Sequence, residues 1–131
     1  MTHQNVYGCP TCWPELAIDA WEAQSALKAE TVLIDDTHFR VWTLRCPGCA
    51  QGFVCVFPET IDWADGEDPM YWTVLPITPA ESASLVSLGD SVCERDLNAL
   101  GSGRRSLRRD FPKSAEPRCY WGSGILVGPH D

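Results

Sequence analysis

The sequence has 131 residues, of which 44% are hydrophobic and six are tryptophan, so it predicts a folded domain rather than a disordered tail. No run approaches the roughly 18 apolar residues of a membrane span, and the first residues lack the basic start of a signal peptide, which indicates a cytoplasmic protein. The formal net charge is −8, and residues 1–70 carry eleven acidic residues against three basic ones. Such acidity opposes contact with nucleic acid and favours solubility.

Two cysteine pairs with the same spacing are the strongest pattern in the sequence. They read Cys9-Pro10-Thr11-Cys12 and Cys46-Pro47-Gly48-Cys49. Two intervening residues place both sulfurs of a pair on one side of a tight turn, and two such turns supply the four thiolates of a tetrahedral zinc. A site with four thiolates leaves no open position for catalysis. The sequence therefore predicts structural Zn²⁺ bound by Cys9, Cys12, Cys46 and Cys49.

Three other interpretations of this pattern stay open. The first pair could be a thioredoxin-like redox motif at the start of a helix, but this would leave the matching second pair unexplained. Disulfides are a second possibility, although seven cysteines make an odd count and a chain of this length does not need them. His38 could be an alternative ligand, although a surface or packed histidine is the more ordinary role.

The two turns resemble the knuckles of the zinc ribbon superfamily, which typically read Cys-Pro-x-Cys-Gly, the second knuckle opening a β-hairpin. Trp13 and Ala50 stand where that glycine is usual, and 33 residues separate the pairs instead of roughly 15–20. The resemblance implies a zinc-pinned hairpin with an insertion between the knuckles. The chain also looks like small uncharacterised bacterial proteins with a knuckle, a Gly-Phe strand and an Asp-Trp…Asp-Pro loop, a likeness that implies no function.

The first half of the chain favours one helix followed by strands. Apolar residues at helical spacing predict a helix over residues 14–29. Short β-branched and aromatic runs then predict strands at 31–34, 39–45, 53–57 and 71–75. The run at 53–57 is apolar on both faces, which is typical of a central strand. We therefore expect a three- or four-stranded antiparallel sheet with zinc at one end.

The second half favours helices and a closing strand. Thr78-Pro79-Ala80-Glu81 is a capping box with proline at the first helical position, so it predicts a helix that ends at Gly89. A second helix is expected over 91–100, and strands at 118–121 and 125–127. The fold class is thus α+β in a single domain over 1–131, with a ribbon-like sheet lobe at 1–77 and a helical lobe at 78–131.

An acidic loop separates the last two strands of the predicted sheet. A calcium loop would need ligands at positions 1, 3 and 5 and a glutamate at 12, and this spacing does not supply them. The loop could bind a basic partner through charge and an aromatic anchor, or it could simply be a solvated turn. The candidate partner-binding residues are Asp62, Trp63, Asp65, Glu67 and Asp68.

The only basic cluster in the sequence lies between 104 and 109. Four arginines around one leucine could hold a nucleic-acid backbone, as in a transcription-associated ribbon. The more ordinary interpretation is a solvated helix end whose arginines pair with the acidic first half. The candidate nucleic-acid contacts are Arg104, Arg105, Arg108 and Arg109.

Motifs of common enzyme classes are missing from the sequence, including the zinc deaminase, Walker, dinucleotide and His-Glu-x-x-His patterns. Cys55, Cys93 and Cys119 remain candidate nucleophiles, but lone cysteines commonly act as small buried hydrophobic residues. The sequence therefore favours a non-enzymatic protein-binding module. Its size and acidity suggest a bacterial immunity protein or antitoxin that inhibits a basic toxin.

Overall fold

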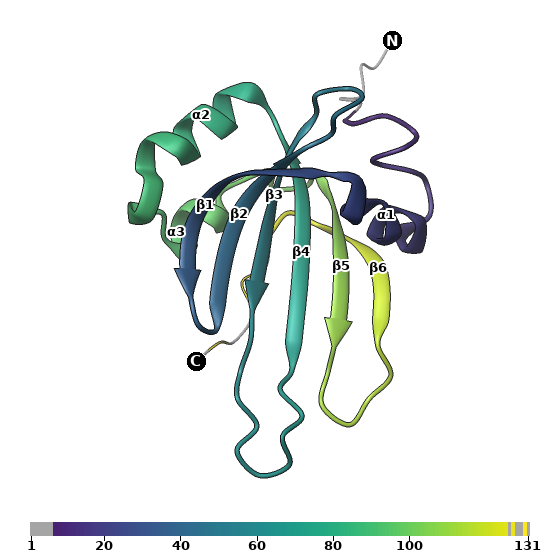
Figure 1. The fold of residues 1–131 in the computed structure, drawn as a ribbon, viewed down its shortest axis with the longest axis vertical. Coiled ribbons are helices and arrows are strands. Elements are labelled where there is room, and N and C mark those ends of the chain that lie inside the picture. The colour runs from purple at the N-terminus through teal and green to yellow at the C-terminus, as the bar shows by residue number, and fades with distance from the viewer. Residues whose placement is uncertain (1–6, 126, 128–129, 131) are drawn as a thin grey trace.

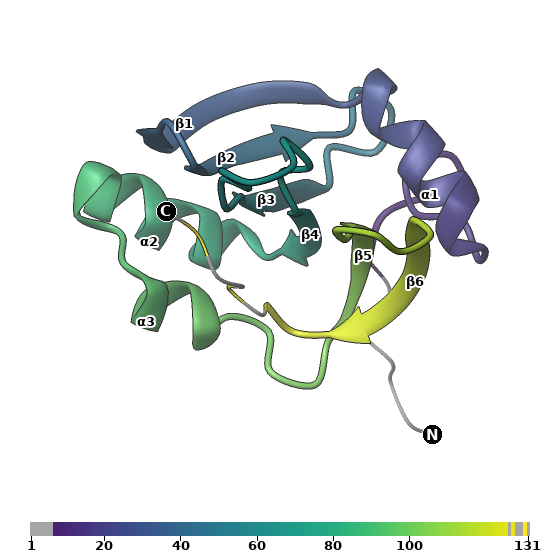
Figure 2. The ribbon, with the colours of Figure 1, turned by 90° about the horizontal axis from the view of Figure 1, so that it is seen from below.

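A computed structural model of the chain describes residues 7–125, 127 and 130, and it shows one curved antiparallel sheet with short helices on both faces (Figures 1 and 2). The strands pair in sequence order as a meander. Antiparallel neighbours need only short connections, and loops supply these except at residues 78–104, a helical segment that connects the fourth strand to the fifth. The strands are β1 (Lys28–Asp36), β2 (Phe39–Arg45), β3 (Gly52–Pro58), β4 (Met70–Ile77), β5 (Arg105–Phe111) and β6 (Arg118–Ser123).

The α+β class is confirmed, and the sheet is larger than the three or four strands predicted. β5 and β6 follow residue 78 in the chain and continue the same sheet from β4. The predicted strand at 118–121 is confirmed as part of β6. The strand predicted at 125–127 is not formed at Ile125 or Val127, and Leu126 lies outside the described residues.

The helix predicted over 14–29 is wrong at both ends. The segment forms α1 (Ala17–Ala23) and one 3-10 turn, η1 (Gln24–Ala26), and β1 then starts at Lys28. Lys28 pairs with Arg45 of β2, so sheet pairing overrides the helical pattern at this point. Leu16, which lies within the predicted helix, precedes the first helical residue and is exposed.

The second helical region keeps its predicted start. In α2 (Pro79–Leu88) the Thr78 side chain accepts from the Glu81 N–H, and the Glu81 carboxylate accepts from the Thr78 N–H, so the capping box is confirmed. The chain then turns through η2 (Gly89–Ser91). α3 (Glu94–Asn98) is shorter than the 91–100 predicted.

The two faces of the sheet bury different side chains, because successive residues of a strand point to opposite faces. Val54 and Val56 of β3 join an aliphatic cluster against Leu85 of α2 and Leu97 of α3. Phe53 and Cys55 join a second, aromatic-rich cluster on the opposite face. That second cluster is covered by the first cysteine turn and α1; its aromatic members are Trp13, Trp21, Trp42, Phe53, Trp72 and Trp121.

Candidate metal centre

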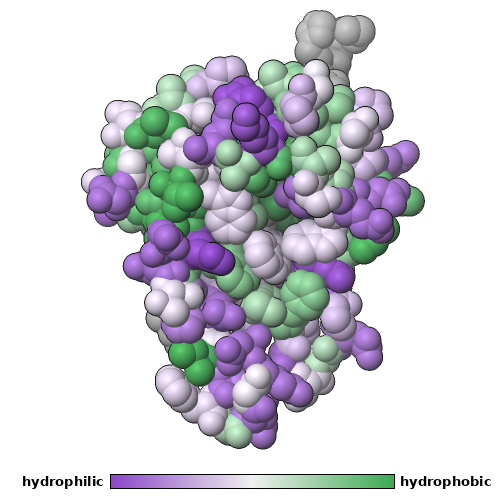
Figure 3. Space-filling model, in the orientation of Figure 1, coloured by the Kyte–Doolittle hydropathy of each residue, from purple (hydrophilic) through white to green (hydrophobic). Residues whose placement is uncertain are grey.

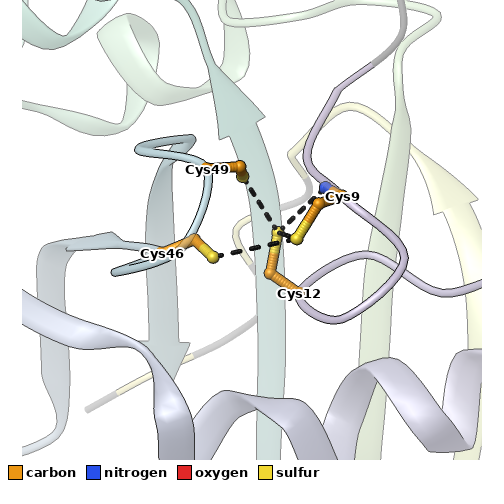
Figure 4. A group of neighbouring side chains, drawn as sticks. All are labelled: Cys9, Cys12, Cys46 and Cys49. Carbon is orange, nitrogen blue, oxygen red and sulfur yellow. Dashed lines mark hydrogen bonds between the residues drawn. The ribbon is translucent and has the colours of Figure 1, made fainter.

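The two cysteine turns meet at one end of the sheet (Figure 4). The Sγ atoms lie 3.7 Å apart for Cys9 and Cys12, 4.0 Å for Cys9 and Cys46, and 3.7 Å for Cys12 and Cys49. All four sulfurs lie within 4.8 Å of one another. A tetrahedral zinc with Zn–S bonds of about 2.3 Å requires sulfurs about 3.8 Å apart, so the donor set fits such an ion.

Backbone hydrogen bonds close both turns. In the first, Trp13 N donates to Cys9 O, and Cys9 N donates to Cys12 Sγ. In the second, Ala50 N donates to Cys46 O. Ala50 has a φ of 66°, in the left-handed region where ribbon knuckles usually carry glycine. The second turn therefore holds a residue other than glycine in the left-handed region.

Gln51 joins the two cysteine turns, and the sequence did not point to it. Its Oε1 accepts from Gly8 N at 3.0 Å, which holds the first turn. Its Nε2 donates to Ile77 O at 2.9 Å at the end of β4. Because Gln51 directly precedes β3, one side chain fixes the first turn to the sheet. In the sequence, the only indication of this role was that a polar residue, Gln51, follows Cys49 by two positions.

The four thiols have different surroundings. Cys12 and Cys46 are buried, Cys9 is half-buried and Cys49 is exposed. Hydrogen bonds from the N–H groups of Cys12 and Thr11 lower the pKa of Cys9 to about 6. Burial raises the pKa of Cys12, so this thiol needs a cation to become a thiolate. The site is thus built to couple cation binding to loss of protons.

Two of the alternative interpretations, a disulfide framework and His38 as a ligand, are not supported by the geometry. All four cysteines are free thiols, which does not fit a disulfide framework. His38 lies in the turn between β1 and β2, where its Nδ1 contacts Glu59 Oε1 at 3.1 Å, and it is not part of the cysteine cluster. The sequence thus identified the four residues that the fold brings together.

The acidic loop lies at the opposite end of the sheet, where two long connections extend side by side (Figure 1). We call the connections 59–69 and 112–117 the loop end, and the two cysteine turns with Arg104 the cysteine end. On the face shown in Figure 3, hydrophilic residues predominate at the loop end. Asp62 accepts three hydrogen bonds within its own loop, from Ala64 N, Asp65 N and Glu67 N. The loop is therefore closed by its own carboxylate.

The sequence also missed the residues that join the two loops. Lys113 Nζ lies 3.0 Å from Asp62 Oδ2 and 2.9 Å from Asp65 Oδ2. Ser114 N donates to Glu67 Oε2 across the same gap. Several of the proposed partner-binding carboxylates thus hold the loop end together, whereas Trp63 is 86% exposed.

The arginine segment is not a helix end, which corrects the prediction, because it forms β5. Each guanidinium contacts other parts of the chain. Arg104 donates to Pro76 O and to both carboxylate oxygens of Glu81. Arg108 donates to Ser106 Oγ and to the carbonyls of Ser123 and Gly124. Arg105 lies 3.8 Å from the Trp121 ring centre, and Arg109 lies 5.7 Å from that of Trp21.

These contacts give the arginines structural roles in the fold. Glu81, the partner of Arg104, lies outside the acidic first half, so the expected pairing with that half is wrong for Arg104. None of the helices among the described residues has the length and apolar character needed to span a bilayer. Comparison with known proteins finds no family model, no curated protein and no solved structure that matches this chain.

Proposed function

We propose that this chain is a zinc-containing, non-enzymatic protein-binding module. In this proposal the metal centre fixes the fold at the cysteine end, and the loop end carries the recognition surface. The zinc assignment is supported by four thiol ligands at tetrahedral spacing. Zn²⁺ bound by four thiolates supplies folding energy rather than a reactive water, because no coordination position stays open.

The observation that carries the binding proposal is the position of Trp63. Its side chain is 86% exposed, although indole rings are usually at least partly buried. The flanking backbone is held by the Asp62 carboxylate, which Lys113 contacts from across the gap. Tryptophan is enriched among residues that dominate binding energy, and a pre-ordered loop loses little entropy on association. Trp63 therefore has the properties of an anchor for a partner's apolar pocket.

Charge at the loop end favours a basic partner. The segment 62–68 has four carboxylates, and Lys113 compensates part of their charge. An acidic rim around an aromatic anchor speeds encounter with a basic protein and disfavours acidic competitors. A basic toxin neutralised by an immunity or antitoxin-type inhibitor is the partner class that fits this charge and the small size of the chain.

The test is recovery of the partner from the native host, followed by affinity measurements on variants. Trp63→Ala should weaken binding by at least about 30-fold, the effect of losing a dominant anchor. Asp65→Asn together with Glu67→Gln should mainly slow association and reduce its dependence on salt. Val86→Ala is the matched control, because Val86 is an exposed apolar residue on α2. A partner whose affinity is unchanged by Trp63→Ala would contradict the proposal.

A further inference from the structure

The two edges of the sheet differ in their protection against pairing with another strand (Figure 1). β1 carries two register shifts, between Ala29 and Thr31 and between Val32 and Ile34. It also carries charged residues at both ends. Natural sheets use such bulges and charges to prevent edge-to-edge association. β1 is therefore a protected edge.

β6 lacks these features. It pairs with β5 through six consecutive residues without a register shift. Its one charged residue, Arg118, contacts Asp110 at 2.8 Å. The remaining residues of β6 are neutral, and two of them are aromatic. By the same criteria, β6 is the edge of this sheet that is open to pairing.

The hydrogen-bond pattern shows which residues face outward. Gly124 N donates to Arg104 O, and Gly122 lies two positions away, opposite Ser106. The backbone N–H and C=O groups of Gly122 and Gly124 therefore point toward β5. Residues alternate in an antiparallel ladder, so the intervening residues direct their N–H and C=O groups away from β5. Arg108 covers one end of this edge by donating to Ser123 O. The outward-facing residues are Cys119, Trp121 and Ser123.

Exposed apolar side chains lie beside this edge on both faces. α1 packs against β5 and β6, and Trp121 Nε1 donates to Glu15 O at 2.8 Å. Leu16 and Ile18 follow directly and are 62% and 44% exposed. Tyr120 is exposed on the opposite face. Strand pairing at β6 would bury these side chains, which adds apolar area to the backbone hydrogen bonds.

We propose that β6 pairs in antiparallel fashion with β6 of a second copy of this chain, about a two-fold axis at Trp121. In this register Trp121 of one copy pairs through its backbone with Trp121 of the other. Cys119 of each copy pairs with Ser123 of the other copy. The outward residues are symmetric about Trp121, so the edge complements itself and forms about four new backbone hydrogen bonds besides those that would share the Ser123 carbonyls with Arg108.

Side chains fit the same register. Tyr120 lies opposite Gly122 of the second copy, which has no side chain. The Arg108 side chain lies over Gly122, since a Cβ there would meet Arg108 Nε at 2.9 Å, and it can face the incoming Tyr120 ring. The two Arg118 residues lie at opposite ends of the paired strands. Like charges are therefore kept apart within the interface.

The experiment is sedimentation of the zinc-loaded chain over a range of concentrations. A chain of 14.5 kDa should form a dimer of twice that mass at about 100 μM. Ser123→Pro removes an outward N–H and leaves the bonds to β5, because proline is tolerated at strand edges. It should raise the dissociation constant at least about tenfold, whereas Ser123→Ala should not.

A second pair of variants avoids any change to the backbone. Ile18→Glu places a charge beside β6 and should also weaken the dimer, whereas Val86→Glu alters an equally exposed residue on α2 and should not. A chain that stays monomeric at all concentrations would overturn the proposal. A dimer whose dissociation constant is unchanged by Ile18→Glu and by Ser123→Pro would overturn it as well. So would a dimer in which the amides of β1, and not those of β6, are protected from hydrogen exchange.

Discussion

The contacts at the cysteine end hold separate elements of the fold together, whereas those at the loop end join two neighbouring connections to each other. At the cysteine end, Cys9 and Cys46 are separated by 37 positions and Arg104 and Glu81 by 23, so the contacts tie together distant segments. At the loop end, Asp62 accepts from Ala64, Asp65 and Glu67 of its own loop. The contacts from Lys113 and Ser114, although they span 47 positions or more, join this loop only to the neighbouring connection. Damage at the cysteine end should therefore affect the whole fold, whereas damage at the loop end should stay local.

This difference also separates stability from recognition. Arg104 illustrates the first role, because it bonds to β4 and α2 and lies 4.7 Å from the Tyr7 ring centre. Trp63 is the proposed example of the second, because it is almost fully exposed and belongs to neither hydrophobic cluster. A binding surface on locally braced loops can vary in sequence without cost to the fold.

Removal of the metal ligands should have the largest effect. We expect about one zinc per chain in the purified protein, and Cys12→Ser together with Cys46→Ser should abolish it. The variant should lose more than about 3 kcal/mol of unfolding free energy, because the metal no longer links the first cysteine turn to the second. Metal analysis and urea unfolding, with and without chelator, measure both effects.

Cys93→Ser is the matched control for this prediction. Cys93 is exposed at the start of α3 and lies outside the cysteine cluster. Its replacement should leave the zinc content unchanged, and the urea concentration at the unfolding midpoint should change little. A double variant of Cys12 and Cys46 that unfolds at the same urea concentration as the parent would show that the cysteine end does not depend on metal.

A smaller effect is expected from Glu81→Gln, also at the cysteine end. Burial opposes ionisation of Glu81, but hydrogen bonds from Arg104 and from Thr78 N lower its pKa overall. A carboxyl whose folded pKa is lowered stabilises the fold above its unfolded pKa, and this contribution is lost as the pH falls. Glu81→Gln should therefore cost about 1–2 kcal/mol at pH 7, a difference that shrinks as the pH falls below about 4.5.

Unfolding curves at pH 7 and pH 3.5 measure this difference. Glu22→Gln removes a carboxylate from α1 that makes no ion pair or hydrogen bond among the described residues, so it serves as the control. A Glu81→Gln deficit that is the same at both pH values would show that the Arg104 ion pair does not contribute.

The smallest global effect is expected from Lys113→Met at the loop end. The hydrogen bond from Lys113 lowers the pKa of Asp62, and Asp65 and Asp62 raise the pKa of Lys113. The ion pair between Asp62 and Lys113 is therefore fully formed at pH values between the pKa of Asp62 and the pKa of Lys113. It is lost when the pH falls below the first pKa or rises above the second. Lys113→Met should shift the Asp62 pKa upward while the melting temperature stays nearly constant.

Amide signals of Ala64, Asp65 and Glu67 in NMR spectra report the Asp62 titration directly, because their N–H groups donate to its carboxylate. Lys28→Met, on β1, is the control for loss of one positive charge. An unchanged titration midpoint in Lys113→Met would mean that the two loops are not joined by this lysine, and a large loss of stability would contradict the proposed separation between the two ends.

Features set by neighbours in the chain could be predicted from the sequence. Each cysteine pair is a local turn, so its spacing was enough to identify the candidate metal ligands. The capping box at Thr78 is complete within four residues, and the start of α2 was therefore correct. β3 is apolar on both faces because it lies in the centre of the sheet, and this pattern predicted its position.

Features set by distant partners were decided only by the tertiary structure. The segment 105–111 looked like a solvated basic helix end, but Leu107 pairs with Val74 and Trp121 on either side, and the arginines lie on aromatic rings and backbone carbonyls of other segments. The helical pattern placed Lys28 near the end of a helix, but its backbone pairs with Arg45 of β2 and forms the start of β1. Which secondary structure is most stable for such residues depends on groups up to about a hundred positions away. Local propensity and periodicity contain no information about those groups.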